Sequence, residues 1–418
     1  SAPSVPRVEA LYFNVTTPRQ SLVTPVTLAL PTGSVRQFVE AEEFGYSAAS
    51  YLWDYLRRSN MPGYFLALSG GVDSAASAAC VSIMCQMLMD KIDAGDSKTY
   101  DELCRTVRDR DFAPKTHKDI ANKLFFCVYM GTIYSTGETF NRASALASEI
   151  GCTFANMDIE PIVKSFGEVY AKTFQHELDI SRQNSQENIA CQNIQARSRM
   201  VMAYLCAQML PVTGQREKRW PGSLLVLGSG NLDEAYRGYF TKYDCSSADI
   251  NPIGGCGKIL LRSFLSWAAV AKGMPTLAVI GEASSSSELQ PRKQNQTPEE
   301  EMGFTFDELH LFGRLRMNRR CAPVSMFHRL REVWHNVPLP VIAEKVKRFF
   351  RYYSFNRHKV TTLPPAMHVE SSSCDDNRYD LRPFLYNADW SRQFRVIDAT
   401  VEEEARFEEA DAPNHSPQ

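Results

Sequence analysis

Short apolar runs alternate with longer segments of helical periodicity along most of the chain. Four of these runs have the length of buried strands, and turn residues or polar segments separate them from the helical segments. Parallel strands need such an alternation, because a crossover must return the chain to the start of the next strand. The pattern predicts an α/β fold, a doubly wound parallel sheet flanked by helices with a helical C-terminal extension, and strands at 64–68, 124–130, 152–157 and 223–227.

The regions around this alternation differ in composition. Helical spacing over 34–60, interrupted at Gly45, predicts a helix ahead of the first strand. The tail from Glu402 is rich in Glu and is expected to be disordered. The predicted boundaries are an N-terminal arm or linker at 1–33, an α/β domain at 34–362 with a polar insertion at 90–123 and a mobile polar loop at 283–303, and a C-terminal extension at 363–418.

Composition narrows the classes of function. The 418 residues include 46 Lys and Arg and 48 Asp and Glu, for a net charge of −2, and 44% of them are hydrophobic. Such a chain can bury a core, but it lacks the positive charge of proteins that wrap nucleic acid. The most membrane-like stretch, 74–89, is shorter than the ~18–20 apolar residues of a membrane span. We therefore expect neither a nucleic acid nor a membrane as partner.

The eleven cysteines show no pairing pattern. The sequence has no C-x-x-C pair and no zinc-type Cys/His cluster, and several cysteines lie in apolar runs, among them Cys80, Cys85, Cys127 and Cys206. Reduced, buried thiols of a cytoplasmic protein are the expectation. The first residues include no Met, no basic segment and no apolar segment, so we expect a cut within a linker of a longer protein and not a signal peptide.

The strongest chemical signal is the segment Ser69-Gly-Gly-Val-Asp-Ser74, at the turn between the first predicted strand and the next helix. Two adjacent glycines permit close backbone approach and positive φ values, so successive N–H groups can converge on an anion. The helix that follows adds the positive end of its dipole. Asp73 cannot itself attract phosphate, but it can hold Mg²⁺ against phosphate oxygens. A plain turn with a capping serine is the simpler structural alternative.

A second glycine-rich segment, Gly254-Gly-Cys-Gly-Lys258-Ile, does not match a nucleotide-binding P-loop. Pro252 stands where that motif begins with glycine, and Ile259 replaces the Ser or Thr that would bind Mg²⁺. We interpret the segment as a turn ahead of a helix at 259–271, with no role in the chemistry.

Segment 69–74 resembles the PP-loop of the ATP pyrophosphatases, which cleave ATP between its α- and β-phosphates and adenylate a substrate. Over roughly residues 40–362 the chain resembles one branch of that group, the NAD synthetases, in particular the synthetase half of the eukaryotic glutamine-dependent enzymes. The stretches that carry the resemblance are Asn193-Ile-Gln-Ala-Arg-Ser-Arg-Met, Leu227-Gly-Ser-Gly-Asn-Leu-Asp-Glu, Gly238-Tyr-Phe-Thr-Lys-Tyr-Asp with Ala248-Asp-Ile-Asn-Pro-Ile-Gly, Ser287-Glu-Leu-Gln-Pro and Ser354-Phe-Asn-Arg-His-Lys. Asp244-Cys-Ser-Ser departs from the glycine-rich turn that the family often has, which leaves the shape of that loop open.

The resemblance implies an adenine nucleotide alpha hydrolase-like fold and a ligase that joins ammonia to the nicotinate carboxylate of deamido-NAD. A carboxylate is a poor electrophile, so its oxygen would first attack the α-phosphorus of ATP, expelling pyrophosphate and leaving an acyl-adenylate. Ammonia would then attack the carbonyl carbon, and AMP would leave. Positioning and charge neutralisation should dominate such a reaction.

The resemblance also assigns roles to particular residues. Asp73 and Glu234, each after a predicted parallel strand, would hold Mg²⁺, and Lys242 would be a cation for the nicotinate end of deamido-NAD. The catalytic set is Ser69, Asp73, Glu234 and Lys242; the ATP set is Leu68, Ser69, Gly70, Gly71, Val72, Asp73, Ser74, Arg199 and Ser229; the deamido-NAD set is Asn193, Glu234, Phe240, Thr241, Lys242, Tyr243 and Lys359.

Some points stay open at the level of sequence. Glu234 could be a solvated first-turn glutamate, and Arg197, Arg199 and Lys359 could be surface charges. In the family the polar loop orders over the site, where it would keep water from hydrolysing the adenylate. Glutamine-using relatives carry a glutaminase domain before the synthetase, which the residues before Ser69 cannot contain, so we expect this chain to use free ammonium. The resemblance implies at least a dimer.

Two other classes of protein remain. Other PP-loop enzymes, such as GMP synthetases and tRNA-modifying thiolases or lysidine-type ligases, share the loop, but the sequence has neither the Cys pairs of thiolases nor the basic extension of tRNA enzymes. A non-catalytic nucleotide-binding module would need the loop but not two metal ligands, so the presence of both Asp73 and Glu234 argues against it. Release of AMP and pyrophosphate from ATP on adding deamido-NAD and ammonium distinguishes the three.

Overall fold

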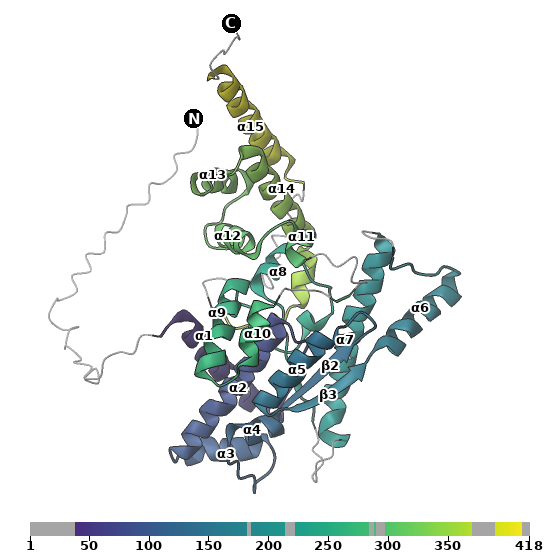
Figure 1. Ribbon diagram of the computed structural model, residues 1–418, viewed down its shortest axis with the longest axis vertical. Coiled ribbons are helices and arrows are strands. Elements are labelled where there is room, and N and C mark those ends of the chain that lie inside the picture. The colour runs from purple at the N-terminus through teal and green to yellow at the C-terminus, as the bar shows by residue number, and fades with distance from the viewer. Residues whose placement is uncertain are drawn as a thin grey trace, which may run out of the picture. The chain divides into compact units, whose positions relative to one another are not determined.

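A computed structural model describes residues 38–181, 185–213, 222–283, 288–289, 297–369 and 389–411. Helices and strands alternate over the first half of this range, and helices follow in the second half (Figure 1). The elements are α1 Glu40–Ser59, β1 Tyr64–Ala67, α2 Val72–Asp93, α3 Ser97–Thr106, α4 His117–Leu124, β2 Phe125–Gly131, α5 Gly137–Ile150, β3 Thr153–Asp158, α6 Glu160–Phe174, α7 Gln186–Thr213, β4 Leu225–Val226, α8 Leu232–Arg237, η1 Cys245–Ser247, α9 Lys258–Ala271, α10 Thr276–Glu282, α11 Pro298–Met302, α12 Phe306–Met317, α13 Pro323–Val333, α14 Leu339–Phe355, η3 Arg357–Thr362 and α15 Ser391–Asp411.

The sheet of the described residues has four parallel strands in the order β3-β2-β1-β4. Phe65 of β1 pairs with Phe126 of β2 on one side and with Val226 of β4 on the other. Because the chain moves outward from β1 to β3 and then returns to β4, the winding direction reverses between β1 and β4. Doubly wound sheets bind ligands at the carboxyl ends of the strands on either side of such a reversal. The predicted fold class is confirmed.

Alternate strand residues face two separate cores. Tyr64 and Leu66 belong to a core that includes residues of α1, α2, α4, α5, α9 and α10. Phe65, Phe126 and Val128 belong to a second core that includes residues of α7. This alternation follows from the two-residue period of a strand, and burial on both faces explains why β1, β2 and β4 are almost continuously apolar.

Helix α2 lies at the centre of the first core. By length and composition it could cross a membrane, but 78% of its most apolar window is buried inside the fold. It packs against α1, α4 and α9. The all-round apolar sequence is therefore what a fully surrounded helix requires.

The structure changes two expectations and shows the order of the 90–123 insertion, which the sequence left open. Helix α1 runs through Gly45 without interruption. The glycine is explained by packing and not by a turn, because a Cβ there would lie only 2.9 Å from the Trp267 ring of α9. The insertion at 90–123 contains the end of α2 and the helices α3 and α4, whose buried residues Leu103 and Ile120 join the first core. The tail from Glu402, expected to be disordered, continues α15 to Asp411 instead. Residues 1–33 and most of the polar loop lie outside the described residues.

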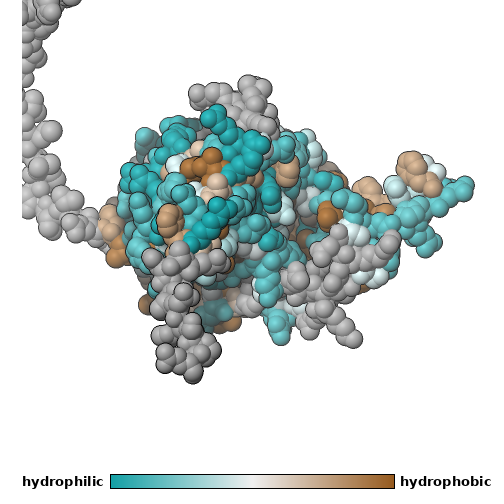
Figure 2. Space-filling view, turned by 90° about the horizontal axis from the view of Figure 1, so that it is seen from above, coloured by the Kyte–Doolittle hydropathy of each residue, from teal (hydrophilic) through white to brown (hydrophobic). Residues whose placement is uncertain are grey.

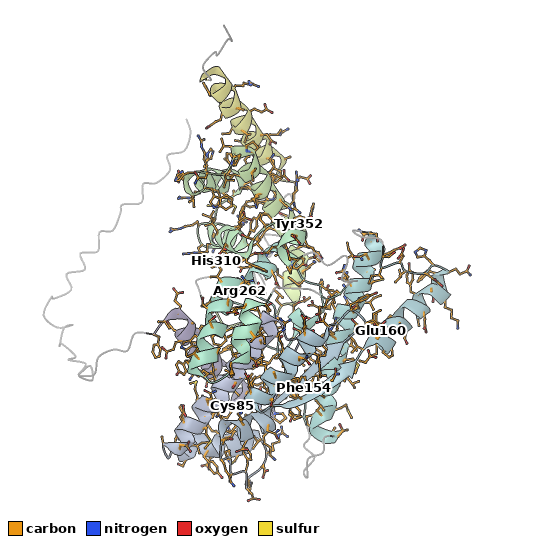
Figure 3. The ribbon with its side chains drawn as sticks, viewed as in Figure 1. Cys85, Phe154, Glu160, Arg262, His310 and Tyr352 are labelled. Atoms are coloured by element: carbon orange, nitrogen blue, oxygen red, sulfur yellow. The ribbon has the colours of Figure 1, made fainter. Side chains whose placement is uncertain are left out.

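The helical second half has its own core, built from α8, α12, α13, α14 and α15. Phe312, Phe349 and Phe350 are fully buried there, and Phe394 and Ile397 attach α15 to it. That attachment is why α15 forms despite its acidic sequence, because tertiary packing supplies most of a helix's stability. Figure 3 shows His310 on α12 and Tyr352 on α14, both on the side of this helical region that faces the sheet.

Candidate active site

The segment 69–74 forms a tight turn between β1 and α2. Gly70 has φ +78°, and a Cβ there would lie 2.2 Å from the carbonyl oxygen of Thr139, so only glycine fits. The hydroxyl groups of Ser69 and Ser74 lie 2.8 Å apart and close the turn. Gly71 precedes α2 and has no side chain to cap it, so the first-turn N–H groups are left for an anion or solvent.

Two carboxylates and one ammonium meet beside this turn. Lys258, the first residue of α9, lies 2.5 Å from Asp73 Oδ2 and 3.7 Å from Glu234 Oε1. Asn231 connects the same groups, since its amide donates to Asp73 Oδ1 at 3.1 Å and its oxygen accepts from the Glu234 N–H at 3.0 Å. Loops after β1 and β4 thus bring together residues distant in sequence.

The pKa values of these groups reflect one buried ammonium shared by two partly buried carboxylates. Burial raises the pKa of Glu234 to about 7, although the charge of Lys258 opposes the shift. Burial by itself lowers the pKa of Lys258, but the charges of Asp73 and Glu234 outweigh it and leave that pKa raised. The cluster therefore carries one carboxylate more than its ammonium neutralises, and a further cation would be stabilised there.

Asp233 supports the cluster from behind. Its side chain is fully buried, and its Oδ2 accepts the backbone N–H of Lys258 at 2.7 Å, which holds the start of α9 in place. Burial raises the pKa of Asp233 to about 6, and His310 of α12 lies 3.8 Å from its other oxygen. The helical second half thus contacts the residue that fixes Lys258.

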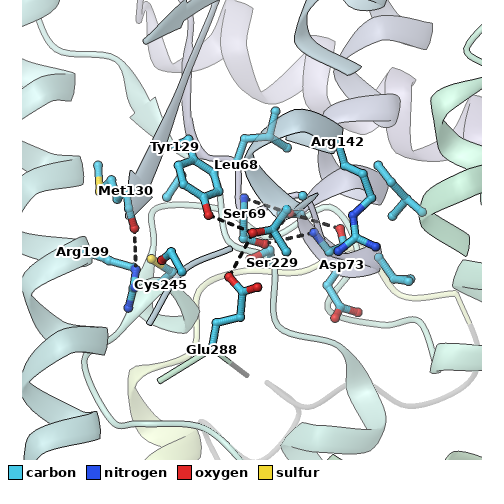
Figure 4. A pocket seen from close by; sticks show the side chains of 18 of the residues that line it. Leu68, Ser69, Asp73, Tyr129, Met130, Arg142, Arg199, Ser229, Cys245 and Glu288 are labelled. Carbon is cyan, nitrogen blue, oxygen red and sulfur yellow. Dashed lines mark hydrogen bonds between the residues drawn. The ribbon is translucent and has the colours of Figure 1, made fainter. Parts of the chain in front are cut away.

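A cavity of about 340 Å³ opens over the turn at the carboxyl ends of β1, β2 and β4. Figure 4 shows Ser69, Asp73 and Ser229 on one side of it, Tyr129 and Met130 on another, and Arg142, Arg199 and Glu288 around them. Glu288 belongs to the polar loop, and it accepts a hydrogen bond from Thr139 Oγ1 at 3.0 Å. We call this the first cavity.

A second cavity of about 440 Å³ adjoins the first, and Ser229, Glu234 and Asp244 line both. Much of its remaining wall comes from the segment after α8 and from α14 and η3, with Phe240, Tyr352 and Lys359 among its residues. The Lys359 ammonium donates to the carbonyl oxygens of Gly238 and Phe240 at 2.9 Å, and burial lowers its pKa. Glu234 therefore lies where the two cavities meet.

The predicted residues divide between these cavities. Every residue predicted for ATP lines the first one, namely Leu68, Ser69, Gly70, Gly71, Val72, Asp73, Ser74, Arg199 and Ser229. Four predicted for deamido-NAD line the second one, namely Glu234, Phe240, Thr241 and Lys359.

Three other predicted residues are not among the described residues that line either cavity. Asn193 accepts a hydrogen bond from Thr241 Oγ1 at 2.6 Å, so it contacts the wall indirectly. The Lys242 ammonium lies 5.1 Å from the centre of the exposed Tyr243 ring, outside both cavities. The catalytic role of Lys242 stays a prediction.

The two arginines of α7 differ in position. Arg199 lines the first cavity, its Nε donates to the Met130 carbonyl oxygen at 3.1 Å, and burial lowers its pKa. Arg197 is exposed and donates to the Lys242 carbonyl oxygen at 2.9 Å. Arg199 is therefore part of the wall of the first cavity, and Arg197 contacts the segment beside the second cavity.

Sequence reasoning missed Lys258, Arg142, Asp244 and Glu288 as site residues. The interpretation of the segment around Lys258 as a turn before a helix was correct, but the conclusion that it has no part in the site was wrong. Its place in the site follows from a contact that the sequence pattern does not show: Ile250, which precedes the segment, bridges Leu227 in parallel and so continues the sheet. A helix starting after that bridge begins at the same edge as the turn at 69–74. In the Asp244 loop, whose shape the sequence left open, Asp244 caps the short helix η1 through Ser246.

The parallel sheet, the turn at 69–74 and the cavity above it together define a PP-loop protein of the adenine nucleotide alpha hydrolase type. A family model described as NAD synthase matches residues 46–361. This chain belongs to that family.

Comparisons with individual proteins agree. The glutamine-dependent NAD(+) synthetase of Dictyostelium discoideum is 48% identical over 366 residues, which are 86% of this chain and 51% of the relative. The rat enzyme of the same name is 46% identical over 367 residues, 86% of this chain and 50% of the relative. The chain thus spans about half the length of the curated relatives it matches. The crystal structure of a glutamine-dependent NAD(+) synthetase from Cytophaga hutchinsonii has the same fold, with a TM-score of 0.70 and 24% identity over 86% of this chain and 56% of that one.

Proposed function

We propose that this chain catalyses the ATP-dependent amidation of deamido-NAD to NAD⁺ through an acyl-adenylate, with release of AMP and pyrophosphate. The observation that carries the proposal is the junction of the two cavities at Ser229 and Glu234. A nucleotide triphosphate over the turn at 69–74 would have its α-phosphate near the opening into the second cavity. A carboxylate held in the second cavity would then reach that phosphorus.

The chain's residues suit the two steps. The N–H groups at the start of α2 and the guanidinium of Arg199 would hold ATP, while Lys359 would order the wall against deamido-NAD. The nicotinate oxygen forms a bond to the α-phosphorus as the bond to pyrophosphate breaks, and ammonia then displaces AMP from the carbonyl carbon. The protein's main contribution would be to orient the reactants and neutralise charge.

Mg²⁺ fits the pair of carboxylates. Asp73 and Glu234 both lie near one cation, Lys258, so they are close enough together to share a charge. Within the described residues no group of three or more His, Cys, Asp or Glu side chains could hold a metal by itself. Mg²⁺ in such sites uses one or two carboxylates and completes its shell with phosphate oxygens and water. When bound, it would neutralise the phosphates of ATP.

Ammonia is proposed as the nitrogen donor of this chain. The matched relatives are named glutamine-dependent, and this chain spans about half their length. In the proposal a glutaminase domain of the same polypeptide supplies ammonia to this half, and free ammonium replaces it when the chain acts alone.

The test measures AMP and pyrophosphate from ATP and Mg²⁺ as deamido-NAD, ammonium or glutamine is added or omitted. The proposal expects both products, and NAD⁺, only with deamido-NAD and ammonium together. Products with xanthosine monophosphate or tRNA in place of deamido-NAD would indicate another PP-loop ligase. Absence of turnover with every acceptor would indicate a binding module, and turnover with glutamine would contradict the ammonia proposal.

We also propose that the chain forms a homodimer through α6 and α7. Phe166, Val169, Tyr170 and Phe174 lie on one side of α6 with exposed side chains, and Val201, Leu205 and Met209 form a similar stripe on α7. Figure 2 shows apolar patches among polar ones on the side of the molecule where α6 lies. Apolar surface of this extent is typical of an interface, and α6 and α7 pack together, so one partner copy could cover both stripes.

A further inference from the structure

Arg142 lies against the turn at 69–74, and the proposed reaction gives it no role so far. It belongs to α5, which packs under the turn so closely that a Cβ on Gly70 would meet the Thr139 carbonyl oxygen at 2.2 Å and the Ala143 nitrogen at 3.3 Å. Arg142 lies between those two positions in the helix and lines the first cavity. Figure 4 shows its side chain reaching toward Asp73.

The guanidinium of Arg142 has unused donors. Its Nε is buried and makes no hydrogen bond, and among the described residues no ion pair to it is formed. A buried N–H without a partner costs free energy, and guanidinium donors match phosphate oxygens in pairs. A side chain in this state next to an anion-binding turn is suited to a phosphate ligand.

The other cations of the first cavity are already engaged. Lys258 pairs with Asp73 and Glu234, and the Nε of Arg199 donates to the Met130 carbonyl oxygen. The described residues lining this cavity include four carboxylates, those of Asp73, Glu234, Asp244 and Glu288, against the three cations Arg142, Arg199 and Lys258. A triphosphate therefore needs the donors of Arg142 as well as Mg²⁺.

We propose that Arg142 binds the β- and γ-phosphates of ATP and stabilises the departing pyrophosphate. When the nicotinate oxygen bonds to the α-phosphorus, the bond from that phosphorus to the bridging oxygen breaks and its electron pair moves onto pyrophosphate. Arg142 lies beside the turn and not at the junction of the cavities, so its charge meets the leaving group and not the adenylate. This inference rests on the proposed function, because it assigns part of the same reaction.

Binding measurements test the inference without turnover. Pyrophosphate with Mg²⁺ and AMP with Mg²⁺ are titrated into the wild-type chain, Arg142→Ala and Arg142→Lys. We expect Arg142→Ala to weaken pyrophosphate binding by about 10- to 100-fold, the value of one or two charge-assisted hydrogen bonds. AMP binding should not change, and Arg142→Lys should restore part of the affinity, because lysine keeps the charge and loses the fork. Arg105→Ala, an exposed arginine in the last turn of α3, is the matched control and should bind both ligands as wild type does.

The outcomes separate this inference from the proposed function. Equal loss of AMP and pyrophosphate binding in Arg142→Ala would overturn it, since that points to a distorted turn. Unchanged pyrophosphate binding would overturn it as well. If pyrophosphate binding falls selectively but the wild type makes no NAD⁺ from deamido-NAD, the role of Arg142 stands and the proposed function fails.

Discussion

Lys258 of α9 donates a hydrogen bond to the Asp73 carboxylate of α2 at 2.5 Å, across 185 positions of sequence. Its side chain is 4% exposed, and the same ammonium lies 3.7 Å from Glu234. The pair connects the turn after β1 with the start of α9, and Glu234 of α8, which follows β4, lies beside both. It therefore holds together the two halves of the first cavity.

Replacing Lys258 by Met should destabilise the fold. The change leaves Asp73 and Glu234 without their ammonium, and removal of one partner from a buried ion pair costs about 3–5 kcal/mol. Mg²⁺ should stabilise Lys258→Met more than wild type, because it supplies the missing positive charge. Urea unfolding with and without Mg²⁺ measures both effects. Lack of any stabilisation of Lys258→Met by Mg²⁺ would contradict a cation site at these carboxylates.

Replacing either carboxylate, Asp73 or Glu234, should lower turnover with little effect on stability, unlike replacing Lys258. Asp73→Ala and Glu234→Ala each leave Lys258 with one carboxylate, so the melting temperature should change little. Turnover should fall about 100-fold or more, the scale on which one preorganised electrostatic group acts. Steady-state kinetics beside thermal unfolding gives the comparison, and extensive unfolding of either variant would make the carboxylate structural.

The sheet could be predicted because β1, β2 and β4 are short apolar runs that alternate with helical segments. The path of α1 through Gly45 could not, since it depends on the distant rings of Phe264 and Trp267. The same limit applies to α15. Phe394 and Ile397 pack into the core of the helical second half, and sequence periodicity does not show that these helices pack together. Local patterns determine the elements, and packing between distant segments determines their ends.

In the site too, residues within one motif could be predicted, whereas residues brought in by packing of distant segments could not. The residues at 68–74 are contiguous, so one motif places them together. Lys258 was set aside because its segment fails the P-loop pattern, yet its position depends on the bridge between Leu227 and Ile250 and on Asp233. Lys242 was assigned from resemblance alone; its ammonium lies over the Tyr243 ring, and its role stays a prediction.

Gly70→Ala should damage both stability and ATP binding. A left-handed backbone costs a non-glycine residue roughly 1–2 kcal/mol, and the contact with the Thr139 carbonyl oxygen adds to it. Gly137→Ala is the matched control, because nothing lies within 4 Å of a Cβ at that first residue of α5. Chemical denaturation and ATP titration of both variants make the comparison. Equal effects would mean that the close approach of the turn to α5 is not a constraint.

Buried thiols should resist alkylation in the folded protein. Burial raises the pKa of Cys80, Cys85 and Cys127 well above the usual range, and the thiolate is the reactive form. At pH 8 iodoacetamide should therefore modify these three only after denaturant is added, whereas the half-buried Cys191 should react earlier. Mass spectrometry of digested samples identifies the modified residues. Rapid labelling of Cys80 in the native protein would contradict the packing of α2.

The proposed dimer has a direct test in α6. Val169 is 66% exposed on the apolar side of that helix, and Val270 of α9 is 88% exposed outside the proposed interface. Val169→Asp should lower the mass in sedimentation from that of a dimer to that of a monomer, because burying an unpaired carboxylate in an apolar interface is costly. Val270→Asp introduces the same charge on another helix and should remain dimeric. If the wild type is a monomer, the proposed dimer does not form. If Val169→Asp remains a dimer, α6 is not part of the surface that joins two copies.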